Sequence, residues 1–207
     1  DVLPRVTLFT PEEKIRLESA HKEFLANMET LSDLEYRKEM ERLGVDLSWK
    51  SSQIEGNTYS LLETERLLKE KQTAQGKTKE EAVMLLNHKD ALDFILDCPD
   101  YLKELSVRRL EDIHSILTKE LGVGNGIRKR RVGITGTNYR PLDNEFQIRE
   151  ALEDTCQLIN GKENVFEKAL LILVLLSYIQ AFTDGNKRTA RISSNAVLIA
   201  WGYCPIS

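Results

Sequence analysis

The chain has 207 residues, of which 41% are hydrophobic and 30% are charged, so its composition is that of an ordinary globular protein. These values exclude a disordered, collagen-like or low-complexity protein, and a chain of this length can bury a core without a disulfide or a structural metal. The net charge of −4, from 29 Lys and Arg against 33 Asp and Glu, provides no general attraction to nucleic acid.

The cysteines and the apolar runs bear on the compartment. The three cysteines are far apart and form no CxxC pair, which argues against a zinc site or a disulfide framework and predicts a reducing, cytoplasmic location. The strongest apolar run, residues 169–176, is too short to cross a bilayer, so we expect no membrane partner. The cysteines are Cys98, Cys156 and Cys204. Separately, because the chain starts with Asp, we expect it to be cut from a longer protein.

Helix start signals recur along the chain. Four segments begin with a capping box, in which a Ser or Thr is followed three residues later by Glu, and apolar residues at helical spacing follow each one. We expect further helices over 105–121, 143–160, 164–182 and 185–201, the third of them central because it is apolar nearly all round. The capping pairs are Thr10 and Glu13, Ser32 and Glu35, Ser60 and Glu63, and Thr78 and Glu81.

One segment does not fit the helical pattern. Residues 122–142 contain five glycines separated by short β-prone pieces, which predicts a small β-hairpin, or flap, over residues 126–142. The predicted fold class is therefore all-α with one β-hairpin. We expect residues 1–75 to form an N-terminal helical arm and residues 76–207 to form the core, with the linker near residues 72–79.

Residues 180–191 carry the clearest chemical signal. An apolar helix ends, a turn of Asp184, Gly185 and Asn186 follows, and a new helix begins with three cations in its first turns. Free backbone N–H groups, the helix dipole and these cations favour an anion, and Asp184 supplies the hard oxygen ligand that Mg²⁺ on phosphates requires. The alternative is a solvated turn with Asp184 as a helix cap. The cations are Lys187, Arg188 and Arg191.

Two motifs resemble the Fic (Fido) family. Residues 180–191 resemble its signature, roughly H-x-F-x-[DE]-G-N-[GK]-R-x-x-R, and residues 51–56 resemble its inhibitory pattern [ST]-x-x-x-E-[GN]. The predicted flap lies where Fic proteins have a hairpin that docks the substrate. The resemblance implies a Fic-type helical bundle of the subclass with an N-terminal inhibitory helix. The matching residues are Phe182, Asp184, Gly185, Asn186, Lys187, Arg188 and Arg191 in the signature, and Ser51, Glu55 and Gly56 in the inhibitory pattern.

The resemblance implies protein adenylylation, in which AMP moves from ATP to a Ser, Thr or Tyr hydroxyl of a target protein. Asp184 would hold Mg²⁺, Asn186 would contact the α-phosphate, Arg188 would bind the β-phosphate and Arg191 the γ-phosphate. Phe182 would anchor the turn in the core. The backbone N–H groups of Gly185, Asn186 and Lys187 would form an anion hole.

Position 180 departs from the family pattern. Family members have a His there as the general base, whereas this chain has Gln180, whose amide has no nitrogen that titrates near neutral pH. We expect structural or surface roles for His21, His88 and His114, so none replaces the base. The chain is therefore either an adenylyltransferase with weak or absent transfer, or a catalytically inactive Fic-fold module that binds nucleotide and partners. Gln180 is either natural or engineered.

The inhibitory motif predicts autoinhibition. By resemblance, Glu55 would pair with Arg191 and occupy the place of the γ-phosphate, while Ser51 would orient the helix and Gly56 would follow its end. The simpler interpretation of Glu55 is an exposed acid at a helix end.

The flap predicts how a target docks. Its residues Val132, Gly133, Ile134 and Thr135 would present an open edge to which a target segment adds a strand, unless the segment is only a connecting loop. The basic run at residues 128–131 would favour an acidic partner. The net charge of −4 argues against a DNA-binding regulator that would use the helix containing Lys187. Formation of a homo-oligomer is kept as an alternative.

Overall fold

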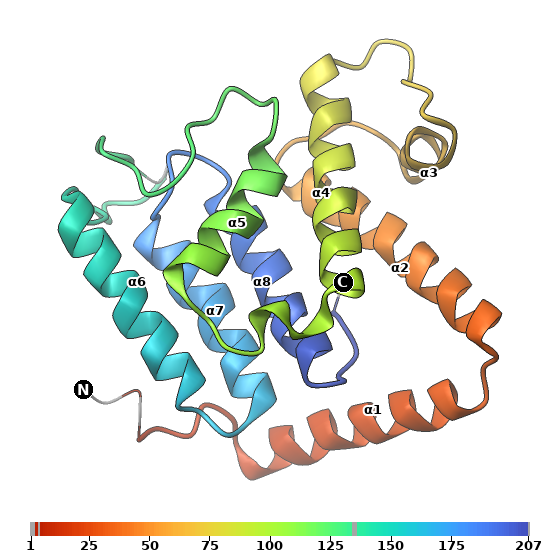
Figure 1. Ribbon diagram of the computed structural model, residues 1–207, viewed down its shortest axis with the longest axis horizontal. Coiled ribbons are helices and arrows are strands. Elements are labelled where there is room, and N and C mark those ends of the chain that lie inside the picture. The colour runs from red at the N-terminus through yellow and green to blue at the C-terminus, as the bar shows by residue number, and fades with distance from the viewer. Residues whose placement is uncertain (1–2, 4, 134–135, 207) are drawn as a thin grey trace.

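The structure is a computed structural model that describes residues 3, 5–133 and 136–206. The described residues form eight α-helices and one short 3-10 helix and contain no strand, which confirms the all-α prediction (Figure 1). None of these helices is long and apolar enough to cross a membrane. The elements are α1 (Pro11–Glu29), α2 (Asp33–Ile54), α3 (Leu61–Glu70), α4 (Lys79–Asp97), η1 (Pro99–Leu102), α5 (Val107–Thr118), α6 (Glu145–Asn160), α7 (Val165–Ile179) and α8 (Asn186–Ala200).

Local sequence signals set most helix starts. All four predicted capping boxes form, at the starts of α1 to α4, with both reciprocal hydrogen bonds present. Side chains of Ser106, Asn144 and Asn164 cap α5, α6 and α7. Two predicted helices end three residues early. The chain leaves α5 at Lys119, where ψ is 131°, and leaves α7 at Gln180, which adopts a left-handed conformation.

The core is centred on α7 and α8. These two helices pack side by side, with α6 against α7 and with α4 and α5 against α8 (Figure 1). Ile172 and Leu176 of α7 are fully buried, as the apolar sequence predicts. One side of α7 is nevertheless exposed, where the side chains of Val174 and Tyr178 have exposed fractions of 52% and 56%.

The predicted β-hairpin is wrong for the described residues of the 126–142 segment, which contain no strand. The backbone N–H of Arg128 donates to the carbonyl of Ala181 at 3.0 Å, outside the segment. Gly126 and Gly136 have positive φ, which places turns in the segment. Val132 is half-buried and Gly133 is exposed, while the predicted docking residues Ile134 and Thr135 lie outside the described residues.

The first two helices follow the outside of the molecule, α1 along the bottom and α2 up the right side in Figure 1. Helix α1 has no fully buried residue, and its His21 ring stacks on Tyr203 with ring centres 3.7 Å apart. The C-terminal half of α2 is different: Leu47, Ser48 and Ser52 are buried, and this half packs on α4. The end of α2 is therefore fixed on the core, although α1 is largely exposed.

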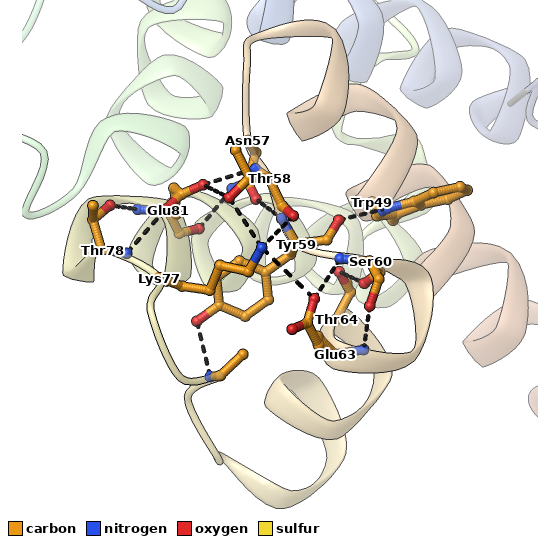
Figure 2. A network of polar contacts seen from close by, with 11 residues as sticks. Trp49, Asn57, Thr58, Tyr59, Ser60, Glu63, Thr64, Lys77, Thr78 and Glu81 are labelled. Carbon is orange, nitrogen blue, oxygen red and sulfur yellow. Dashed lines mark hydrogen bonds and ion pairs between the residues drawn. The ribbon is translucent and has the colours of Figure 1, made fainter.

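A polar network fixes the chain that follows α2 to the start of α4 (Figure 2). The Glu81 carboxylate accepts hydrogen bonds from the N–H and the hydroxyl of Thr58, at 2.7 and 2.6 Å. The Asn57 amide donates to the Glu81 carbonyl at 2.8 Å, and Lys77 donates to the Thr58 carbonyl at 2.5 Å. Hydrogen bonds from the Thr58 side chain and from the Thr78 and Thr58 backbone lower the pKa of Glu81 to about 2. The network holds the end of α2 in one place relative to α4.

Candidate functional site

The turn between α7 and α8 is closed by the side chain of Asn186. Its Oδ1 accepts from the N–H of Phe182 at 2.8 Å, and its Nδ2 donates to the Phe182 carbonyl at 2.8 Å and to Oε1 of Gln180 at 3.2 Å. Gln180 has φ 53° and ψ 53°, a left-handed conformation that costs a non-glycine residue about 1–2 kcal/mol. The turn therefore sets the direction of the side chain at position 180.

Helix α5 packs against this turn through His114 and Thr118. Phe182 is fully buried and stacks on His114 with ring centres 3.9 Å apart, and Nε2 of His114 lies 2.9 Å from the Asp184 carbonyl oxygen. Gly185 has φ 80°, and a Cβ there would lie 3.0 Å from Cγ2 of Thr118. Glycine is therefore required at this position by both its backbone angle and its close approach to α5. The expected core roles of Phe182 and His114 agree with these contacts.

Helix α8 is the one α-helix of the described chain that no side chain caps. The N–H groups of its first turn therefore have no side-chain acceptor and face the turn that precedes the helix. Arg188, only 3% exposed, pairs with the Asp184 carboxylate at 3.0 Å. Its Nε and Nη1 have no hydrogen-bond partner in the part of the chain that the structure describes. A buried cation with two free donors beside an uncapped helix start is suited to an anion.

Arg191 joins α8 to the end of α2. Its Nε donates to the Ser51 hydroxyl at 2.9 Å, and its Nη2 donates to the Ser51 carbonyl at 3.1 Å and to the Glu55 carboxylate at 2.6 Å. Glu55 is the C-cap residue of α2, and Gly56 follows with φ 90°. The structure thus brings together the two motifs that the sequence places 136 residues apart.

His88 lies in the core beside the candidate site, in agreement with the structural role expected for it. It is 1% exposed, and neither ring nitrogen has a partner among the described residues. Burial, followed by the positive charges of Arg191 and Arg188, lowers its pKa to about 3. The spacing of His88 with Leu85 and Leu92 on the core face of α4 could have indicated an inward position, but not the two arginines beside it.

We expect the neutral His88 to make stability depend on pH. Its folded-state pKa, about 3, is below the ordinary value of 6.5, so its contribution is complete above pH 6.5 and declines as the pH falls toward 3. The free energy of unfolding should then fall by up to about 1.4 kcal/mol per pH unit for this group. Urea unfolding at pH 7, 6 and 5 measures the slope.

The variant His88→Gln should have a shallower slope than the unmodified chain. Part of the slope should remain, because burial also lowers the pKa of His114. Gln72→Asn, at an exposed and uncharged position between α3 and α4, is the control and should keep the full slope. Parallel curves for His88→Gln and the unmodified chain would contradict the assignment.

The predicted nucleotide residues differ in exposure. The side chain of Asp184 is 64% exposed and Lys187 is exposed, whereas Asn186 and Arg188 are buried. The described residues contain no cluster of three or more His, Cys, Asp or Glu that could hold a metal ion alone. A single exposed carboxylate fits Mg²⁺ that arrives with phosphates, since such ions use one or two carboxylates together with the substrate.

The sequence comparisons agree with the predicted family. Residues 104–198 match the model of the Fic/DOC family. Over 160 residues the chain is 29% identical to a protein adenylyltransferase, fic-1, of Caenorhabditis elegans, covering 74% of this chain and 31% of that protein. It is also 29% identical over 166 residues to a protein adenylyltransferase Fic of Nematostella vectensis, covering 76% of this chain and 38% of that protein. The chain thus spans about a third of the length of these relatives.

Solved structures show the same fold. A segment of Fic-1 from C. elegans superposes with a TM-score of 0.80 at 23% identity, covering 94% of this chain and 59% of that chain. A Fic domain containing signaling protein from Bacteroides thetaiotaomicron superposes with a TM-score of 0.77 at 22% identity, covering 93% of this chain and 74% of that chain. The family resemblance is confirmed, while the inhibitory subclass stays a prediction.

Proposed function

With residues 104–198 matching the Fic/DOC family, we propose that this chain is built to transfer AMP from ATP to a Ser, Thr or Tyr hydroxyl of a target protein, and that Glu55 inhibits it in cis. The matched relatives are named protein adenylyltransferases. The observation that carries the proposal is the uncapped start of α8 beside Arg188, whose buried guanidinium has two unpartnered nitrogens. A polyphosphate would satisfy both features at once.

The phosphates would lie along the first turns of α8. Arg188 would donate to the β-phosphate, and Arg191 would donate to the γ-phosphate once Glu55 has left it. The backbone N–H groups of Gly185, Asn186 and Lys187 would surround the α-phosphate. The side-chain amide of Asn186 is already bound within the turn, so its contact with the α-phosphate stays a prediction.

Asp184 would hold the Mg²⁺ of a bound MgATP. Its exposed carboxylate is the suitable oxygen ligand, and it pairs with Arg188 at 3.0 Å in this structure. The cation would supply charge neutralisation across the phosphates. Phosphoryl chemistry relies mainly on such positioning and electrostatic stabilisation, which the chain's own cations also provide.

Deprotonation of the target hydroxyl lacks a general base in this chain. Gln180 cannot accept the proton as a general base, so we expect transfer to be weak or absent in this chain.

The target would approach from the side of Val132 and Gly133, as the family resemblance implies. Reduced cysteines fit a cytoplasmic location, since all three are unpaired.

The second candidate is a catalytically inactive module that binds nucleotide and protein partners. Its supporting observation is that both ends of the Gln180 amide are engaged. Nε2 donates to the Ser177 carbonyl at 2.6 Å, and Oε1 accepts from Asn186 at 3.2 Å. In this candidate Gln180 stabilises the turn, and binding is the whole activity.

Titration of the chain with MgATP in a calorimeter tests the shared core of both candidates. Arg188→Gln should raise the Kd at least about tenfold, because a hydrogen bond from a charged group contributes roughly 1.5–3 kcal/mol. Arg16→Gln removes the same charge from an exposed position on α1 and should leave the Kd unchanged. Equal Kd values for Arg188→Gln and the unmodified chain would contradict the proposed site.

A further inference from the structure

Arg128 is buried at the base of the 126–142 segment. It is 2% exposed, although it opens a basic run whose other members, Lys129, Arg130 and Arg131, are exposed. Unlike them, it makes a set of contacts with backbone carbonyls. An arginine buried within a basic run of exposed side chains requires an explanation, because a buried guanidinium needs acceptors for its N–H groups.

The acceptors come from three places in the chain. Nε of Arg128 donates to the Gln180 carbonyl at 2.6 Å, and Nη1 donates to the Arg130 carbonyl at 2.8 Å. Nη2 donates to the Leu142 carbonyl, and the backbone N–H donates to the Ala181 carbonyl at 3.0 Å. One side chain thus ties both ends of the 130–142 stretch to the residue that follows α7.

The hydrogen bond from Arg128 acts on residue 180, whose backbone conformation needs support. Its left-handed backbone is unfavourable for a non-glycine residue, so surrounding contacts must hold it. The N–H of Gln180 bonds to the Leu176 carbonyl at 3.3 Å, and its carbonyl bonds to Arg128 at 2.6 Å. The planar guanidinium suits this role because its N–H donors point in fixed directions, whereas the three N–H donors of a lysine ammonium rotate freely.

From these contacts, and resting on the proposed function, we infer that Arg128 is a positioning residue for AMP transfer. It holds the backbone of residue 180 so that the side chain there faces Asn186 and the start of α8. By anchoring Arg130 and Leu142 to the same point, it also sets where a target hydroxyl approaches that side chain. Arg128 itself touches neither ATP nor the target.

The first test measures the backbone of residue 180 directly, by NMR of labelled protein. In Arg128→Ala, the ¹³Cα and carbonyl shifts of Gln180 should move away from left-handed values, and in Arg128→Lys they should move partway. Arg130→Ala is the matched control, because it removes a neighbouring charge and keeps the carbonyl that Arg128 binds. Free guanidinium ion, added to Arg128→Ala at concentrations below those that unfold it, should restore part of the shift.

The second test measures transfer in the Gln180→His background. Arg128→Ala should lower kcat by about 10- to 100-fold, the effect of a small misplacement at a reacting group, while the KM for ATP stays within about twofold. At saturating target, Arg130→Ala should change neither kcat nor the KM for ATP, because the loss of one exposed charge of the basic run affects only the affinity for the target. Guanidinium should recover part of kcat in Arg128→Ala but have no such effect in the Arg130→Ala control.

The outcomes separate the positioning role from the proposed function. If the Gln180→His variant transfers no AMP, the proposed function fails, and the NMR comparison alone decides the role of Arg128. Unchanged shifts at Gln180 in Arg128→Ala would overturn the inference. So would a fall in ATP affinity that matches a fall in melting temperature and does not respond to guanidinium, since that result indicates a purely structural role.

Discussion

Replacing Gln180 by His is expected to raise the rate of AMP transfer by about 10²- to 10⁴-fold, the usual contribution of a positioned general base. The side chain at this position already faces Asn186 at the start of α8, where its Oε1 accepts a hydrogen bond at 3.2 Å. An imidazole placed there titrates near neutral pH and can take the proton of a target hydroxyl. The residues proposed to bind the phosphates are not changed, so the Kd for MgATP should stay within about twofold.

The measurement is auto-adenylylation with radiolabelled ATP. Gln180→Asn is the matched control, because it keeps an amide at the same backbone position and should leave the rate unchanged. A larger rate for the His variant alone identifies a latent enzyme. Equal rates for the His and Asn variants, with MgATP binding retained in both, would instead favour the nucleotide-binding module.

Local signals predicted the helices well, because a capping box is decided by residues three apart. Thr78 and Glu81, for example, form the predicted pair at the start of α4. The turn at residues 184–186 was predictable for the same reason, since a glycine with φ 80° at Gly185 allows a left-handed step between two helices. Each of these features depends on a short stretch of chain.

The 126–142 segment was not predictable from its β-prone residues. Its described part contains no strand, and Arg128 at its base bonds to the carbonyls of Ala181 and Gln180 instead of to a neighbouring strand. The basic run itself gave no sign that its first member is buried. Strand propensity depends on the partners that tertiary packing supplies.

The prediction of the site had two grounds, the chemistry of its residues and the family resemblance. The residue types at Asp184, Arg188 and Arg191 favoured an anion on physical grounds, but those grounds left a solvated turn as the alternative. The contact between Arg191 and Glu55 came only from the family resemblance, because no local rule joins residues that lie 136 positions apart. The buried position of His88 agrees with its expected structural role, but its proximity to the two arginines depends on the packing of α4 on α8, which no local rule predicts.

Glu55→Gly is expected to increase the affinity for MgATP by about tenfold, the effect of removing one competing charge-assisted hydrogen bond. Glu55 holds Nη2 of Arg191 at 2.6 Å, and the two side chains are 25% and 21% exposed, so the pair is only partly screened by solvent. In the variant, Arg191 keeps its two bonds to Ser51 and stays in position. The second N–H of Nη2, which Glu55 no longer accepts, can then donate to the γ-phosphate.

Calorimetric titration with MgATP measures this effect, and ADP provides the internal control. If Glu55 occupies the place of the γ-phosphate, the variant should gain affinity for ATP much more than for ADP, which lacks that group. Glu55→Gln keeps the size of the side chain and removes its charge, so its affinity should be intermediate. Equal or weaker ATP binding by Glu55→Gly, at an unchanged melting temperature, would contradict autoinhibition. In the Gln180→His background the two effects should multiply, because one variant frees the phosphate site and the other supplies the base.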